Sequence, residues 1–334
     1  MKTIQGFLLM EVDVAALNNA GSDKTSNLDN AVVTKKIRKN GREYPYVSGQ
    51  AWRYWWRDTL IKSFDWKMSP VIREKKIAFT QADPIAFPDD DIFGYMRAEK
   101  KATFTRVSPL KNSALIAISY NPIVQNWASM TRQDGDAVPF GVDEYCAVLK
   151  GMFSLDINQV GTFSTVNKTG FMNISEELKK SALENNCVEI DDPVMKDSSN
   201  SPLKLTRLPI KIRETRIKEV IQALKTLSGG AKQTTNMADV TPKLIVLAKF
   251  KSGNHPFSHL AKEELGKPVF SVDALVEIVD EYKEQFDGKV YIGKRKGFMD
   301  DIDTQLQQAF ADEKIQYGPI NFIVDKFVRT ITME

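Results

Sequence analysis

The chain is poor in the side chains that build disulfide scaffolds and metal sites. Its 334 residues include two cysteines and two histidines. Cys146 and Cys187 stand far apart, which excludes a disulfide scaffold or a zinc ribbon and predicts a reducing, cytoplasmic environment. His255 and His259 have Pro256 between them, which disfavours a metal site on one helix. Since they are the only two histidines, a histidine-based nucleophile triad is also disfavoured. We expect no metal and no other cofactor.

Long apolar runs are also missing. The first apolar run, Gly6–Met10, is too short for the core of a signal peptide, and Glu11 and Asp13 follow it closely. No stretch approaches the roughly 20 apolar residues that span a bilayer. We therefore expect a cytoplasmic protein with no membrane partner.

Charge of one sign is not in excess either. The chain has 46 Lys and Arg against 43 Asp and Glu, a formal net charge of +3 at pH 7, which excludes a histone-like polycation. Nucleic-acid binding stays open, because phosphates are bound by local clusters of positive charge. Hydrophobic residues make up 42% of the chain, enough for a core, so a disordered chain is excluded.

Six core segments can be placed by their periodicity, in the order strand, helix, strand, strand, helix, strand. They are residues 4–14, 50–64, 113–120, 151–160, 214–227 and 243–250. This order predicts an α+β fold of the ferredoxin-like (βαββαβ) or RRM-like type. The core would comprise residues 1–64, 113–163 and 214–260, interrupted by insertions at 65–112 and 164–213, and followed by a helical C-terminal segment at 261–334.

Two further regions carry predictions of secondary structure. Residues 121–150 are expected to be loop, with a helix around Glu144–Leu149. In the C-terminal segment, periodicity predicts helices over 271–286 and 298–313, and Pro319 is expected to open a last helix.

A basic block precedes the first predicted helix. Five of the eight residues from Lys35 to Arg42 are Lys or Arg and none is acidic, and Asn40-Gly41 predicts a hairpin there. Ser48 is a plausible N-cap of the helix, whose free N–H groups and dipole favour a phosphate. Arg53 and Arg57, four residues apart, would add guanidinium donors. The alternative is a solvated loop and a surface helix whose arginines meet acidic neighbours.

Other motifs are weaker. The loop from Gly229 to Gln233 can bring its backbone close to a phosphate chain, but it lacks the P-loop pattern, and a helix C-cap with a turn is the alternative. The run Asp89–Asp91 fits a solvated acidic loop better than a cation site. Asp23 and Asp29, in the first loop, are the best candidates for RNA cleavage.

Several segments together resemble a known family. They are Gly6–Met10, Ala16–Gly21, Tyr44–Arg53, Phe93–Tyr95, Thr105–Lys111 and Gly229–Thr234. The chain is similar, over roughly residues 4–250, to CRISPR-associated protein family seven of the RAMP superfamily, the backbone subunit of type I-B Cascade complexes in the DevR autoregulator branch.

The resemblance implies a hand-shaped subunit with an RRM-like palm, a fingers insertion at 65–112 and a thumb within 164–213. Copies would polymerise along a guide RNA (crRNA) and grip its backbone without reading sequence, while the guide pairs with target DNA in antiviral defence. The implied partners are crRNA, target DNA, further copies of the chain and the CRISPR-associated families five, six and eight.

The expected RNA-binding residues fall in four segments. They are Lys35, Lys36, Arg38 and Arg42 in the basic block; Ser48, Gln50, Arg53 and Arg57 on the helix; Arg106 and Lys111 on a returning strand; and Gly229, Gly230, Lys232 and Gln233 in the glycine-rich loop. Related type III subunits cleave target RNA with a first-loop aspartate, a place that Asp23 or Asp29 could take. The branch resembled here is non-cleaving, so we expect no enzyme. A transcriptional regulator, suggested by the autoregulator name alone, has no helix-turn-helix signal.

Overall fold

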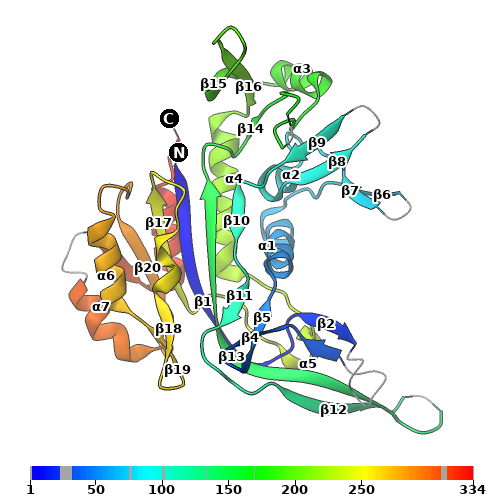
Figure 1. Cartoon of the computed structure of the whole chain (residues 1–334), viewed down its shortest axis with the longest axis vertical. Helices are drawn as coiled ribbons and strands as arrows, with labels where there is room; N and C mark the ends of the chain where they lie inside the picture. Colours follow the sequence, from blue (N-terminus) through cyan, green and yellow to red (C-terminus); the bar gives the residue numbers. More distant parts are fainter. Residues whose placement is uncertain are drawn as a thin grey trace.

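One large sheet runs through the middle of the molecule (Figure 1). The computed structural model describes residues 2–22, 32–74, 77–99, 102–132, 134–168, 170–309 and 314–333. The main path of the sheet has the order β21-β20-β17-β1-β13-β11-β5-β4. The bounds are β21 Ile315–Gly318, β20 Val290–Lys294, β17 Leu244–Phe250, β1 Thr3–Ala15, β13 Val138–Asp156, β11 Leu115–Ala117, β5 Arg42–Val47 and β4 Lys36–Lys39. The fold is mixed α+β, as expected.

Strand β1 forms the centre of this sheet. It pairs antiparallel with β13, with Thr3 opposite Asp156, and with β17, with Thr3 opposite Phe250. Every residue from Thr3 to Met10 is buried, because both faces of the strand are covered. A nearly continuous apolar run is the pattern that such double coverage produces.

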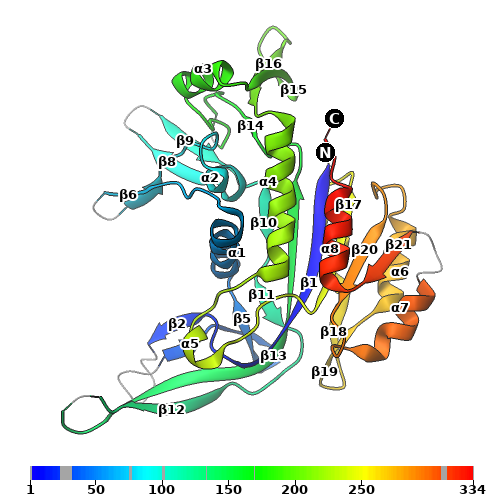
Figure 2. The same ribbon diagram turned by 180° about the vertical axis from the view of Figure 1, so that it is seen from behind.

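One face of the sheet carries α1 (Gly49–Phe64), α4 (Ile210–Gln222) and α8 (Ile320–Arg329), with α4 beside α8 in the rear view (Figure 2). Trp52 and Trp56 of α1 stack with ring centroids 5.2 Å apart, and Trp56 meets Phe153 edge-on. The Trp56 indole N–H donates to the Val220 carbonyl over 2.8 Å, so α1 and α4 are joined by packing and by a buried hydrogen bond.

The opposite face carries α6 (Val272–Glu281) and α7 (Asp303–Ala309) of the C-terminal segment. A second apolar cluster joins Phe7 and Leu9 to these two helices. This segment was expected to be helical, but it also contains β18 (Ala261–Glu264), β19 (Lys267–Phe270), β20 and β21. All of β20 is buried, so its apolar run is that of an interior strand. Helix α6 ends earlier than predicted, at Glu281, and α7 begins later than predicted, at Asp303, whereas α8 begins after Pro319 as predicted.

The prediction for residues 121–150 was wrong. They form β12 (Val124–Met130) and the first part of β13, a long hairpin that projects beyond the sheet (Figure 1). Tyr145, Ala147 and Leu149 are buried at alternate positions of β13, which is the period of a strand.

The two insertions, residues 65–112 and 164–213, together form an arm on one side of α1. The β12–β13 hairpin lies on the other side of this helix (Figures 1 and 2). Residues 65–112 contain β6 Val71–Glu74, β7 Ile77–Thr80, α2 Pro88–Phe93, β8 Tyr95–Ala98, β9 Thr103–Arg106 and β10 Leu110–Asn112. The second insertion contains α3 Glu176–Glu184, β15 Val188–Lys196 and β16 Pro202–Arg207, with β14 (Thr162–Phe163) pairing with β16. Beside the β12–β13 hairpin lie β2 Asn19–Ser22, β3 Val32–Thr34 and α5 Gln233–Asn236.

The acidic run Asp89–Asp91 is not a solvated loop. All three aspartates are buried, and Asp91 is fully so. Its carboxylate accepts from Arg106 over 2.5 Å, from Arg216 of α4 over 2.7 Å and from the Gly161 amide over 2.9 Å. One carboxylate therefore connects α2, β9, α4 and the turn before β14.

Replacing this carboxylate tests its structural role. Asp91→Ala leaves Arg106 and Arg216 buried without their anion, so we expect the free energy of unfolding in urea to fall by about 3–5 kcal/mol. Asp191→Ala is the control, because its ion pair with Lys204 is exposed, and it should change little. Equal, small losses in the two variants would contradict the role given to Asp91.

Candidate nucleic-acid interface

The N-terminus of α1 is open and lacks acidic side chains. The Ser48 hydroxyl accepts from the Ala51 amide over 3.3 Å, which confirms the predicted N-cap, and the Ser48 amide donates to the Asn18 side chain over 2.9 Å. The first turn contains no acidic residue, and Gln50 is exposed there. The positive end of the helix dipole is thus presented without a local anion, which favours a phosphate.

The glycine-rich loop lies against this helix and the end of β1. Gly229 and Gly230 have φ of +152° and +103°, and a Cβ would stand 2.3 Å from Trp55 and 2.6 Å from Leu17 respectively. The Ala231 amide donates to the Leu17 carbonyl, and the Gln233 side chain donates to the Gly229 carbonyl. The glycines thus serve close packing within the protein, and the loop is held rigidly beside α1.

The same loop contacts the β12–β13 hairpin. The Lys232 ammonium lies 5.6 Å from the centre of the Phe140 ring, and the Asn236 side chain donates to Glu144 over 3.1 Å. On β12, Trp127 is 65% exposed. An exposed indole is a surface on which a base can stack. Sequence reasoning missed this residue, although a tryptophan in a polar stretch was a visible signal.

The basic block forms the hairpin β4–β5 as predicted. Glu43, the residue after the block, forms ion pairs with Lys36 at 2.8 Å and with Arg38 at 3.3 Å. The hydrogen bond from Lys36 is the main cause that lowers the pKa of Glu43. Arg42 lies over the Tyr120 ring at 5.1 Å, and the Lys35 amide donates to the Asn18 carbonyl, next to the α1 N-terminus.

Arg53 anchors the insertion arm. Its guanidinium donates to the carbonyls of Leu110 and Phe93 and to the side chains of Asn112 and Ser108 over 2.6–3.0 Å. Burial lowers the pKa of Arg53 to about 10. The N–H groups on its two terminal nitrogens donate within the protein, which leaves little of this guanidinium for a phosphate.

Arg57 lies in the same region of α1. Its guanidinium stacks on the Phe93 ring at 4.6 Å, and burial lowers the pKa of Arg57. Within the described part of the chain its Nε has no hydrogen-bond partner. Arg57 therefore packs on the insertion arm and keeps part of its donor capacity.

Arg106 and Lys111, the two RNA contacts expected on the returning strand, differ in their exposure to solvent. Arg106 is 5% exposed and donates to Asp91 and to the carbonyls of Thr162 and Gln159. It lies inside the protein, so its assignment as an RNA contact is corrected. Lys111, on β10, is exposed and stays a candidate.

The structure thus gathers Lys35, Ser48, Gln50 and the loop Gly229–Gln233 at one place, next to the β12–β13 hairpin. Asp23 and Asp29 lie outside the described residues. Within the described ranges, no group of three or more His, Cys, Asp and Glu side chains is placed to hold a metal ion. No helix in the described part of the chain is long and apolar enough to cross a membrane.

An α+β core of this topology is shared with subunits of known assemblies. A chain in a structure titled "CRISPR RNA-guided surveillance complex" is 9% identical, with 98% of both chains covered and a TM-score of 0.53. A chain in "CRISPR RNA-guided surveillance complex, pre-nicking" is 11% identical, with 98% of this chain and 99% of that chain covered and a TM-score of 0.57. At these identities the likeness shows the fold alone.

The family follows from the sequence. The model described as "CRISPR-associated negative auto-regulator DevR/Csa2" matches residues 8–265. The chain belongs to this CRISPR-associated family, which confirms the resemblance drawn from its motifs. No curated protein matches the sequence.

The rigid placement of the loop can be tested by adding one methyl group. Gly229→Ala would drive a Cβ into the Trp55 indole at a positive φ, so we expect a loss of about 1–3 kcal/mol in unfolding free energy. Gly288→Ala is the control, since its φ is also positive and nothing lies within 4 Å of the added Cβ. A Gly229 variant no less stable than the Gly288 variant, measured by urea unfolding, would contradict the packed loop.

Proposed function

We propose that the chain is a guide-RNA-binding backbone subunit of a Cascade-type, I-B-like surveillance complex, and that copies of it line up along the crRNA. Membership of a CRISPR-associated family and the fold shared with chains of surveillance complexes support this. The observation that carries the proposal is the open N-terminus of α1, free of acidic residues in its first turn and flanked by the glycine-rich loop and the basic hairpin.

The RRM-like palm belongs to this proposal. It would consist of β1, α1, β11, β13, α4 and β17. The sheet order β17-β1-β13-β11, with α1 and α4 packed in one apolar cluster, supports it. Residues 65–112 would be the fingers. Within 164–213 the projecting hairpin is β15–β16, and the β12–β13 hairpin, beside the glycine-rich loop, is a second candidate for the thumb.

Binding would act on the RNA backbone. The α1 N–H groups would meet one phosphate, while Lys35, Arg42, Lys111 and Lys232 would supply positive charge around it. Contacts to phosphates position a strand without reading its sequence. Pairing of the guide with target DNA would then provide specificity. Trp127, exposed on β12, would offer a stacking surface to a base. The complex would further contain CRISPR-associated families five, six and eight.

The basic hairpin should matter for affinity through charge. In a variant with alanine at Lys35, Lys36, Arg38 and Arg42, we expect binding of a long RNA at low salt to weaken about tenfold or more. The slope of log K against log salt should become shallower by about 0.7 for each phosphate that the variant no longer neutralises. A gel-shift titration at several salt concentrations measures both quantities.

A matched variant controls for net charge. It carries alanine at Lys180, Lys251, Lys283 and Lys289, which are exposed on other surfaces. Both variants lose four positive charges, so a non-specific electrostatic effect would weaken them equally. The proposal requires a clear loss in the hairpin variant only, and equal affinities would refute the site.

We further propose that the chain binds RNA in the cytoplasm without cleaving it. The support is its likeness to a non-cleaving branch; the alternative is a type III-like subunit with Asp23 or Asp29 as the catalytic group. A complementary target RNA incubated with the RNA-loaded protein and Mg²⁺ should stay intact, as judged on a denaturing gel. Cleavage that disappears in Asp23→Ala or Asp29→Ala would establish the alternative.

A further inference from the structure

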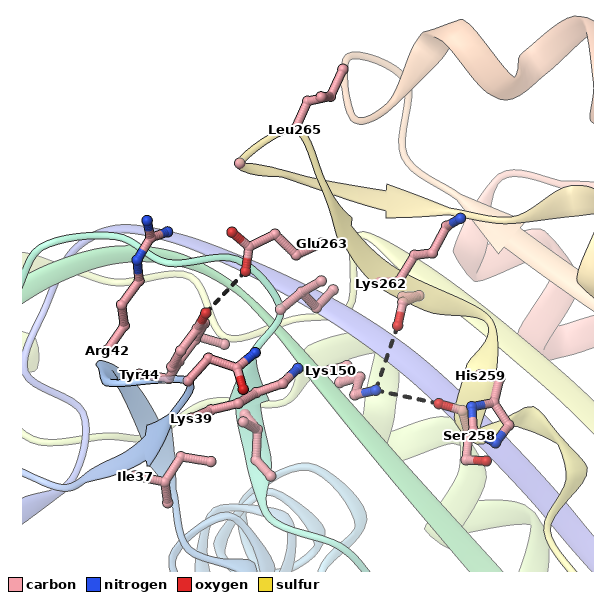
Figure 3. A pocket seen from close by; sticks show the side chains of 16 residues that line it. Ile37, Lys39, Arg42, Tyr44, Lys150, Ser258, His259, Lys262, Glu263 and Leu265 are labelled. Atoms are coloured by element: carbon pink, nitrogen blue, oxygen red, sulfur yellow. Dashed lines mark hydrogen bonds between the residues drawn. The ribbon is translucent and has the colours of Figure 1, made fainter.

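A cavity of about 970 Å³ lies between two hairpins on the sheet face opposite α1 (Figure 3). One wall is β4–β5, the other is β18–β19, and the apolar residues Ile116, Ala117 and Ile118 also line it. Lys150 of β13 lines it and shares its side of the strand with Val148 and Met152, which pack in the C-terminal cluster. The cavity therefore lies on the other face of the sheet from the α1 N-terminus, and the β4–β5 hairpin, with Arg42, borders both places.

Positive charge in this cavity is only partly compensated. Lys39, Arg42, Lys150 and Lys262 line it; Lys262 pairs with Glu264 over 3.4 Å, and the lining carboxylate Glu263 accepts from the Tyr44 hydroxyl over 3.0 Å. The Lys150 ammonium donates to the carbonyls of Ser258 and Ala261 over 3.3 and 3.5 Å. Burial, and then the charge of Lys39, lower the pKa of Lys150. An anion would relieve this repulsion.

The lining favours a protein segment over a nucleic acid. Tyr44 is 4% exposed and its hydroxyl is engaged, so its ring gives a base no surface to stack on. An excess of cations beside apolar lining residues instead suits a helix that presents carboxylates beside one apolar side chain.

Helix α6 of this chain has that chemistry. Asp273, Glu277, Asp280 and Glu281 are acidic, and no basic residue occurs in Val272–Glu281. These four share one exposed face with Val276, which is 37% exposed, because they follow helical spacing. Asp280 pairs with Lys314, whereas Glu277 and Glu281 have no ion-pair partner within the described part of the chain.

We propose that α6 of one copy docks into the cavity between β4–β5 and β18–β19 of the next copy. The proposal deepens the proposed assembly along a guide by naming two complementary surfaces. Figures 1 and 2 place α6 on the outer side of the C-terminal segment, away from β4 and β5, so the two surfaces face different neighbours. A contact between two different patches builds an open row of subunits.

Charge reversal and its repair test this contact. The cavity variant is Lys39→Glu with Lys262→Glu, and the helix variant is Glu277→Lys with Glu281→Lys. We expect each to weaken self-association of the RNA-free full chain about tenfold or more, measured by sedimentation at low salt. A chain carrying all four changes should regain self-association, because the signs are again complementary. Lys180→Glu with Lys289→Glu, at two exposed lysines outside α6 and the cavity, is the matched control and should behave as the wild type.

Three outcomes would refute the proposed contact. They are a wild type that stays monomeric, charge-reversal variants that associate normally, and a chain with all four changes that stays dissociated. Gel shifts of a long RNA with dilute, monomeric protein separate this proposal from the proposed function. Lys262→Glu alone, which lies outside the basic hairpin, should bind RNA as the wild type does; a tenfold loss with normal self-association would make the cavity a nucleic-acid site instead. Wild-type protein that associates as described but binds no RNA would refute the proposed function alone.

Discussion

The carboxylate of Asp91 holds the arm of the molecule to its sheet. Two guanidinium groups, from β9 and from α4, meet this one anion inside the protein, and a backbone amide adds a third donor. Breaking such a buried pair leaves a charge uncompensated, so the elements it joins are strongly coupled. Arg53 adds a second anchor, from α1 to the segment between Phe93 and Asn112. The position of the arm beside α1 depends on these two arginine-rich contacts.

The same contacts show what sequence alone could and could not predict. The order of the six core segments, the Ser48 cap and the α8 helix could be predicted, because periodicity and capping are local properties. Arg53 and Arg106 were predicted to bind RNA because a sequence shows charge and not its partner. The acidic run around Asp91 was read as solvated for the same reason. The β12–β13 hairpin was missed because β13 alternates over residues whose spacing also fits a helix.

The near-neutral net charge of the chain results from separate charged surfaces. The face with α1 presents a helix N-terminus without acidic residues next to a basic hairpin, while the other face has a basic cavity and an acidic helix. An RNA ligand and a neighbouring copy would use different faces of the sheet. Surfaces of both signs are what a subunit needs when it binds a polyanion and also stacks with itself.

The account as a whole depends on the chain holding RNA in an ordered assembly. The direct measurement is to purify the full chain with the RNA that accompanies it in its cell, then determine the particle mass and the length of that RNA. The account predicts a particle with several copies of the chain and RNA of one defined length. A monomer free of RNA, or particles with RNA of random lengths, would contradict it.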